Sequence, residues 1–109
     1  LGPLGLVQRV PPTGAAPDWR CWVGRSATLP RFYAHLPFDG ALATAGNGTM
    51  VAFLAPTPAS VSLAHSAGLA AGGSDEGAPG PRPHYGDGYF GAYLRDPDGH
   101  RVEIYTQDY

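Results

Sequence analysis

The sequence has 109 residues, a length that suits one small domain, and a net charge of −2 at pH 7. Its seven basic residues are all arginines scattered along the chain, which excludes the basic patch of a nucleic-acid-binding protein, and no apolar run is long enough to cross a membrane. The lone cysteine excludes an internal disulfide and a cysteine-based zinc cluster, so we expect a reduced, cytoplasmic setting.

The first half of the chain is predicted to form three short strands. Apolar and aromatic residues gather in the segments 4–10, 18–25 and 31–36, and polar residues or proline and glycine separate them. The stretch PFDGALATAGNG, residues 37–48, is predicted to be a linker.

A strand and a helix are predicted next. The apolar run TMVAFLA, residues 49–55, has the length of a strand. Residues 57–73 are typical of a helix, because Thr57 is a good N-cap, a proline follows it, and two glycines offer a left-handed terminator at the end.

The clearest turn signal lies near the end of the sequence. The turn Asp96-Pro97-Asp98-Gly99 places proline where φ is preset and glycine where a positive φ is needed. The flanking segments 89–95 and 101–106 are therefore predicted to be the two strands of a hairpin. The stretch 73–88, rich in glycine and proline, is predicted to be a loop.

The two halves show a weak internal repeat that aligns Arg31 with Glu103, an offset of 103 − 31 = 72 positions. The second half has the order strand, helix, strands, whereas the first half has strands alone, so we expect a strand and a helix to be missing in front. Three explanations stay open: the chain is part of a longer protein, a partner subunit supplies the missing strand by exchange, or the first half is misassigned. We favour the first.

The second half resembles the vicinal oxygen chelate superfamily, which includes glyoxalase I, bleomycin-resistance proteins and extradiol dioxygenases. The resemblance lies in GTMVAFLA (48–55), in LAAGG (69–73) at the end of the predicted helix, and most specifically in PHYGDGYFGAYLRDPDGHRVEIY (83–105). Members repeatedly show an aromatic strand, a D-P-D-G turn and a strand that bears glutamate.

The resemblance implies an α+β fold of paired βαβββ modules that form a curved, mostly antiparallel sheet around a cleft. The first module would lack its first strand and helix. Residues 1–109 would form one such domain, with a partial first module at 1–36, the linker at 37–48 and the second module at 49–109. Members are commonly dimers, so we expect a homodimer, with strand exchange as one form of it.

Metal-dependent members hold a divalent cation with histidine and glutamate, and the resemblance places Glu103 at the second-module carboxylate ligand. Met50 stands where a metal-binding member has histidine, and a thioether is a poor ligand for such an ion. Arg31 stands at the first-module carboxylate position, and its fixed positive charge repels a metal. We therefore expect no cofactor, with Zn, Ni, Fe or Mn as the alternative.

Glu103 is either a cleft carboxylate available as a general base or the partner of Arg31 in a structural ion pair. Tyr89 and Tyr93 share one face of their strand, but the sequence does not say whether that face lines the cleft. The other aromatic candidates can equally be core residues. The candidate ligand-binding residues are His84, Tyr85, Tyr89, Tyr93, Trp22, Tyr33, Met50 and Arg31.

Two classes of function follow. The first is a metal-free protein of the bleomycin-resistance type, which binds a small molecule in an aromatic cleft. The alternative is a metal-dependent lyase, isomerase or dioxygenase that uses Glu103 with ligands outside this chain. The expected partners are a small-molecule ligand and a second subunit, and neither nucleic acid nor a membrane.

Overall fold

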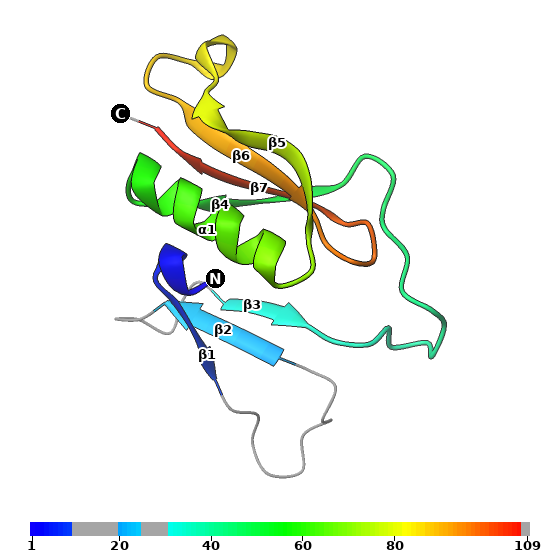
Figure 1. Cartoon of the computed structure of the whole chain (residues 1–109). Helices are drawn as coiled ribbons and strands as arrows, with labels where there is room; N and C mark the ends of the chain where they lie inside the picture. The colour runs from blue at the N-terminus through cyan, green and yellow to red at the C-terminus, as the bar shows by residue number, and fades with distance from the viewer. Residues whose placement is uncertain (10–19, 25–30, 108–109) are drawn as a thin grey trace. The chain divides into compact units, whose positions relative to one another are not determined.

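The computed structural model describes residues 1–9, 20–24 and 31–107 (Figure 1). The chain divides into two compact units, Leu1–Ala43 and Thr44–Tyr109, and each is described by itself. Positions 10, 18, 19 and 25, at the ends of predicted strands, lie outside the described residues.

The first unit contains a three-stranded antiparallel sheet. A short 3-10 turn, Gly2–Leu4, precedes β1 (Leu6–Arg9), which pairs with β2 (Arg20–Gly24), and β2 pairs with β3 (Arg31–Ala34). The three predicted strands are thus confirmed, with tighter bounds.

The second unit contains a strand, a helix and three further strands. The elements are β4 (Met50–Leu54), α1 (Pro58–Ala70), β5 (Ser74–Pro81), β6 (Phe90–Arg95) and β7 (Arg101–Thr106). Strand β4 runs parallel to β7, and the other neighbouring strands are antiparallel, in the order β4-β7-β6-β5. A 3-10 turn, η2 (Pro83–Tyr85), separates β5 from β6.

Helix α1 begins and ends as its capping residues predict. The Oγ1 atom of Thr57 accepts a hydrogen bond from the amide of Ser60 at 3.1 Å. The helix ends at Ala70, three residues before the predicted end, and Gly72 then adopts the left-handed conformation, with φ of 108°. No helix within the described residues combines the length and the apolar character that crossing a bilayer requires.

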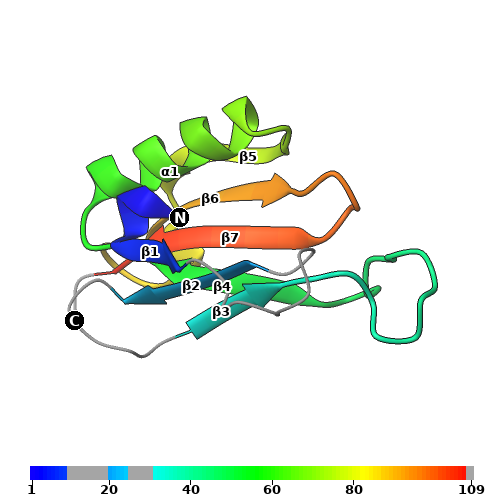
Figure 2. The same ribbon diagram turned by 90° about the horizontal axis from the view of Figure 1, so that it is seen from below.

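The core of the second unit lies between α1 and one face of its sheet (Figure 2). Val61 and Ala64 of the helix are buried there, as are Ala92 and Ile104 of the strands. The helix approaches β6 closely at Gly68, where even a methyl group would clash with a core leucine 2.5 Å away. Helix α1 therefore does not cover the opposite face of the sheet, whose side chains are available to form a site.

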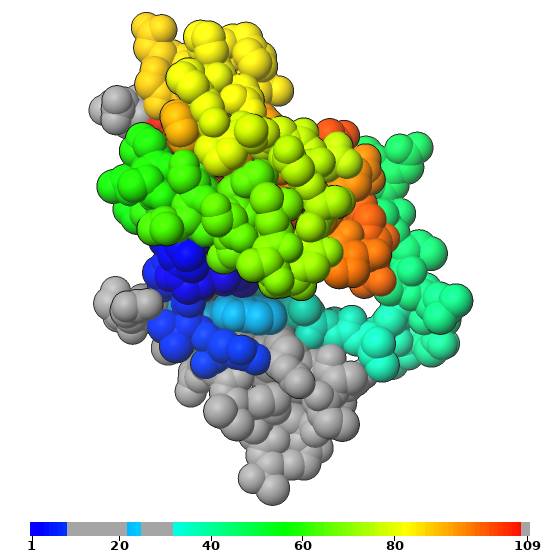
Figure 3. Space-filling model, viewed as in Figure 1, coloured from blue at the N-terminus to red at the C-terminus, as the bar shows by residue number. Residues whose placement is uncertain are grey.

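The predicted loop at 73–88 is wrong over its first half. Residues Ser74–Pro81 form β5, which pairs with β6 through two shifts of register, at Asp75/Gly77 and Gly77/Gly80. Figure 3 shows α1 and β5 as one continuous face of the second unit, with the segment around η2 projecting from its end. Local propensity does not predict this strand, because glycine and proline both lower strand propensity. The edge of β6 nevertheless provides a pairing partner for it.

Candidate functional site

The sheet face opposite α1 carries a buried glutamate. In the ladder, Glu103 of β7 lies opposite Tyr93 of β6 on one side and opposite Ala52 of β4 on the other. Because paired residues point to the same side of a sheet, these side chains share a face with Arg101 and Tyr105, two positions along β7 in each direction. The register thus assigns the faces that the sequence left open: Tyr93 and Glu103 point away from the helix.

Glu103 is only 6% exposed and already has a hydrogen-bond donor. The hydroxyl of Tyr89 donates to its Oε1 atom at 3.0 Å. The other oxygen, Oε2, lies beside Gly91: a Cβ atom added to this glycine would be 3.7 Å from Oε2. A carboxylate buried in this way depends on its donor, because removing a charge from water is costly without a compensating hydrogen bond.

Tyrosine rings surround this carboxylate. The ring of Tyr89 stacks on that of Tyr105, with centroids 5.4 Å apart and planes 7° from parallel. Tyr85 packs at a tilt against Tyr89 at 5.3 Å, and the ring of His84 lies 4.1 Å from Tyr85. Stacked and tilted aromatic pairs at such distances stabilise one another and exclude water from what lies beneath.

The phenols of Tyr89 and Tyr93 are held in their protonated form. Burial, followed by the hydrogen bond to Glu103 and its negative charge, raises the pKa of Tyr89 above its ordinary value of 10.0. Burial and the same carboxylate raise the pKa of Tyr93 as well, with a further contribution from Tyr85. At neutral pH these hydroxyls therefore act as hydrogen-bond donors and not as bases.

A pocket of about 440 Å³ opens beside the cluster, formed by residues of the second unit. This volume lies in the range of small-molecule sites, about 300–1,000 Å³. Among the described residues Tyr93 lines the pocket, whereas Glu103, its neighbour across the β6–β7 ladder, does not. The lining residues are Gly48, Thr49, Met50, Glu76, Arg82, His84, Tyr85, Tyr93 and Arg101.

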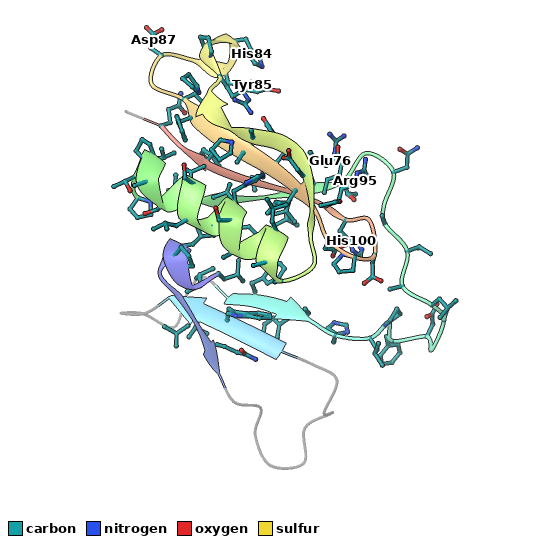
Figure 4. The ribbon with its side chains drawn as sticks, viewed as in Figure 1. Glu76, His84, Tyr85, Asp87, Arg95 and His100 are labelled. Carbon is teal, nitrogen blue, oxygen red and sulfur yellow. The ribbon has the colours of Figure 1, made fainter. Side chains whose placement is uncertain are left out.

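Two charged groups of the pocket are held by neighbours. The Oε1 atom of Glu76 accepts a hydrogen bond from Nε of Arg95 at 2.6 Å, so its charge is paired. The guanidinium of Arg82 donates to the carbonyls of Ala78 and Pro81, at 2.8 and 3.2 Å, and its Cζ atom lies 5.6 Å from the ring centroid of Tyr93. In Figure 4, Glu76 and Arg95 lie beside one another, whereas His84 and Tyr85 lie together at the end where η2 projects.

The structure brings together part of the predicted ligand-binding set. His84, Tyr85, Tyr93 and Met50 line the pocket, and Tyr89 lies in the tyrosine cluster beside it.

The remaining predicted residues belong to the first unit. Trp22 and Tyr33 belong to the first unit, where Trp22 packs against Phe32 with ring centroids 6.0 Å apart. The side chain of Arg31 lies outside the part of the chain that is described, so its predicted pairing with Glu103 stays a prediction.

Sequence reasoning missed the charged lining of the pocket. Arg82 and Glu76 fall in the stretch predicted to be a loop, and Arg101 was not singled out at all. The period of two along β7 was the available signal for Arg101, since it places that residue on the same face as Glu103.

Within the described part of the second unit, the strand neighbours of Glu103 do not supply the further ligands that a divalent metal needs. On its face of the neighbouring strands stand Ala52, Met50 and Tyr93, none of which offers an imidazole or a second carboxylate. A separate group of potential ligands, Asp96, Asp98 and His100, lies in the turn between β6 and β7.

This turn group is explained by the turn itself. Asp96 accepts hydrogen bonds from the amides of Asp98 and His100, at 3.0 and 2.8 Å, and its second oxygen lies 2.9 Å from the His100 ring. Its carboxylate is therefore engaged in stabilising the hairpin turn.

Comparisons with known proteins place this fold. No family model matches the sequence, and no curated protein matches it. A glyoxalase/bleomycin resistance protein from Albidiferax ferrireducens T118 is 33% identical over 98% of this chain and 82% of its own, with a TM-score of 0.83. A hypothetical protein from S. aureus shares the fold at 18% identity, with a TM-score of 0.66 over 96% of this chain and 78% of its own.

A glyoxalase-related enzyme from Fulvimarina pelagi also shares the fold, at 21% identity and a TM-score of 0.64, over 89% of this chain and 70% of its own. Identity of one third across nearly the whole chain, together with the strand-helix-three-strand order of the second unit, goes beyond a shared architecture. The chain belongs to the glyoxalase/bleomycin resistance protein family, within the vicinal oxygen chelate superfamily.

Proposed function

We propose that this protein binds a small aromatic molecule without a metal, in the pocket lined by Tyr85 and Tyr93. The observation that carries the proposal is that Tyr93 lines the pocket whereas its ladder neighbour Glu103 does not. Among the described residues Glu103 is the buried carboxylate of this face, and its Oε1 atom already accepts a hydrogen bond from Tyr89, so the pocket meets an aromatic surface there and not an open acid.

The lining supports a flat ligand. Tyr85 is 56% exposed and His84 lies against it, so both rings are accessible from the pocket side. Met50, which is 47% exposed, adds a flexible apolar surface on the β4 side. Aromatic rings combined with a polarisable thioether suit a planar apolar body and adapt to its outline.

The test combines elemental analysis with binding. Protein purified without chelator is expected to carry no stoichiometric Zn, Ni, Fe or Mn, and naphthamide, a neutral planar probe, is expected to bind in isothermal titration calorimetry. Tyr93→Phe keeps the ring and should keep the affinity, whereas Tyr93→Leu should weaken binding roughly tenfold, because one lost aromatic contact accounts for about that factor.

Two results would overturn the proposal. One is a stoichiometric metal that is lost in Glu103→Gln, which would instead support the metal-dependent enzyme. The other is naphthamide affinity that is unchanged by Tyr93→Leu in a folded variant, since the ring would then not form part of the site.

A further inference from the structure

We propose that the pocket selects an anionic ligand, an aromatic ring that carries a carboxylate or sulfonate group. This inference rests on the proposed function, because it names the charge of the molecule that the same pocket would hold. It is carried by two arginines that converge on the pocket, Arg82 and Arg101, and by the way the neighbouring acids are already engaged.

Arg101 provides a cation that has no ion-pair partner among the described residues. It is the first residue of β7, lies opposite Met50 and Arg95 in the ladder, and is exposed at the pocket. The ion pairs among the described residues of the second unit involve other groups, and Glu76, the acid of the pocket lining, is paired with Arg95. An unpaired guanidinium at the edge of a pocket attracts an anion and can bind both oxygens of a carboxylate.

Arg82 is a second cation, and it is held in place before any ligand arrives. Its bonds to the carbonyls of Ala78 and Pro81, together with its position over the Tyr93 ring, restrict its rotamers. These contacts occupy one N–H on each terminal nitrogen and leave other N–H groups for a ligand. Because this half-buried side chain loses little further freedom on binding, little of its interaction energy with a ligand is offset by lost conformational entropy.

Two glycines of β5 make this arrangement possible. A Cβ atom at Gly77 would lie 2.9 Å from Cδ2 of Tyr93 and 3.5 Å from a guanidinium nitrogen of Arg82. A Cβ atom at Gly80 would lie 3.1 Å from the other terminal nitrogen of Arg82. The register shifts of β5 occur at these same two glycines, so the strand leaves room for the guanidinium of Arg82 over the ring of Tyr93.

The acids nearby do not cancel this charge. Glu76 is the lining acid, and Arg95 neutralises it at 2.6 Å. Glu103 is buried, accepts a hydrogen bond from Tyr89 and does not line the pocket. Arg82 and Arg101, neither of which has an ion pair with a described residue, therefore determine the sign of the potential that a ligand meets, and a cationic ligand is repelled.

The test uses three probes matched in ring and substitution position: the naphthoate anion, naphthamide and the naphthylmethylammonium cation. At low salt, naphthoate is expected to bind roughly tenfold more tightly than naphthamide, with the cation weakest, and the preference should shrink as salt is added. Arg101→Gln should weaken naphthoate binding several-fold and naphthamide binding much less, so that the preference for naphthoate shrinks, and Arg101→Lys should restore part of it.

A change of opposite sign gives an independent readout. Glu76→Gln is expected to tighten naphthoate binding and to weaken binding of the cation. The matched control is Asp98→Asn, which removes the same charge from an exposed turn residue that does not line the pocket, and it should alter neither affinity.

The outcomes separate the two proposals. Equal affinity for naphthoate and naphthamide, or tighter binding of the cation, would overturn the charge selection and leave aromatic binding standing. A preference for naphthoate that persists in folded Arg101→Gln and Arg82→Gln proteins would overturn the assignment to these arginines. Failure of all three probes to bind would overturn both.

Discussion

The hydroxyl of Tyr89 is expected to be the main stabilising partner of the buried Glu103 carboxylate. Tyr89→Phe removes this hydroxyl and keeps the ring, so the stack on Tyr105 is preserved. The lost bond is a 3.0 Å donation to an oxygen of a side chain that is 6% exposed, where water replaces the donor poorly. The variant therefore isolates one hydrogen bond to a buried charge.

The magnitude follows from that burial. Hydrogen bonds to charged groups contribute about 1.5–3 kcal/mol, and bonds between neutral partners contribute about 1 kcal/mol. Tyr89→Phe is thus expected to lower the free energy of unfolding by about 2 kcal/mol at pH 7. In a Glu103→Gln background the same change should cost about 1 kcal/mol, which gives a coupling energy of about 1 kcal/mol in a double-mutant cycle.

The assay is urea denaturation of the four proteins of the cycle, followed by the far-UV circular dichroism of α1, which lies in the same unit as the pair. The control is Tyr105→Phe, which removes a hydroxyl from the other ring of the stack and should cost less than about 0.5 kcal/mol. A loss in Tyr89→Phe no larger than in this control, or the same loss in both backgrounds, would refute the assignment of Tyr89 as the donor to a buried charge.

Two further predictions concern the second unit. Gly73→Ala should lower the free energy of unfolding by about 2 kcal/mol, because its Cβ would lie 2.9 and 3.1 Å from backbone oxygens of α1 and β6 that cannot rotate away. A urea titration in which this variant loses no more stability than Ala71→Gly, in the same turn, would contradict the prediction. The raised pKa values of Tyr89 and Tyr93 predict stability that is fully present below about pH 10 and is lost as the pH rises further, since the unfolded chain releases its phenolic protons first. Urea midpoints measured on either side of that pH should show the decline, and replacing both tyrosines by phenylalanine should flatten it.

The elements set by local chemistry could be predicted from the sequence. Thr57 and the proline after it define where α1 begins, and the turn 96–99 joins β6 to β7 as expected. In both places the interaction that fixes the element joins residues close in sequence. At the start of α1, for example, the Oγ1 atom of Thr57 accepts a hydrogen bond from the amide of Ser60. Such interactions form without reference to the rest of the fold.

Strand β5 could not be predicted in this way. Its sequence, SDEGAPGP, contains two glycines and two prolines, which local propensity assigns to a loop. The strand forms because the edge of β6 that β7 leaves open accepts a further partner, and α1 packs on β5 as well as on β6. The usable signal was the order of elements. Three strands were predicted in the first half but only two after the helix in the second half, so the internal repeat lacked one strand there.

The candidate site divides along the same line. Alternation along the strand predicted that Tyr89 and Tyr93 share a face, but only the register with β7 shows that the face of Tyr93 is the one bearing Glu103. Arg82 escaped notice because its role depends on a 3-10 turn and two register shifts that place it over Tyr93. Long-range pairing therefore creates the pocket, and local patterns reveal only its tyrosines.

The role of Glu103 illustrates how neighbours determine what a side chain does. A glutamate on this strand next to imidazoles would provide one ligand of a Lewis acid, but its face-sharing neighbours in the second unit are Ala52 and Tyr93, and Tyr89 donates a hydrogen bond to its Oε1 atom. The guanidinium groups of Arg82 and Arg101 line the pocket, and such groups can orient an anion but offer no open coordination position. A site of this kind would hold and select a ligand by its ring and charge without polarising a bond, so the proposed metal-free binding and the proposed preference for anions rest on the same side chains.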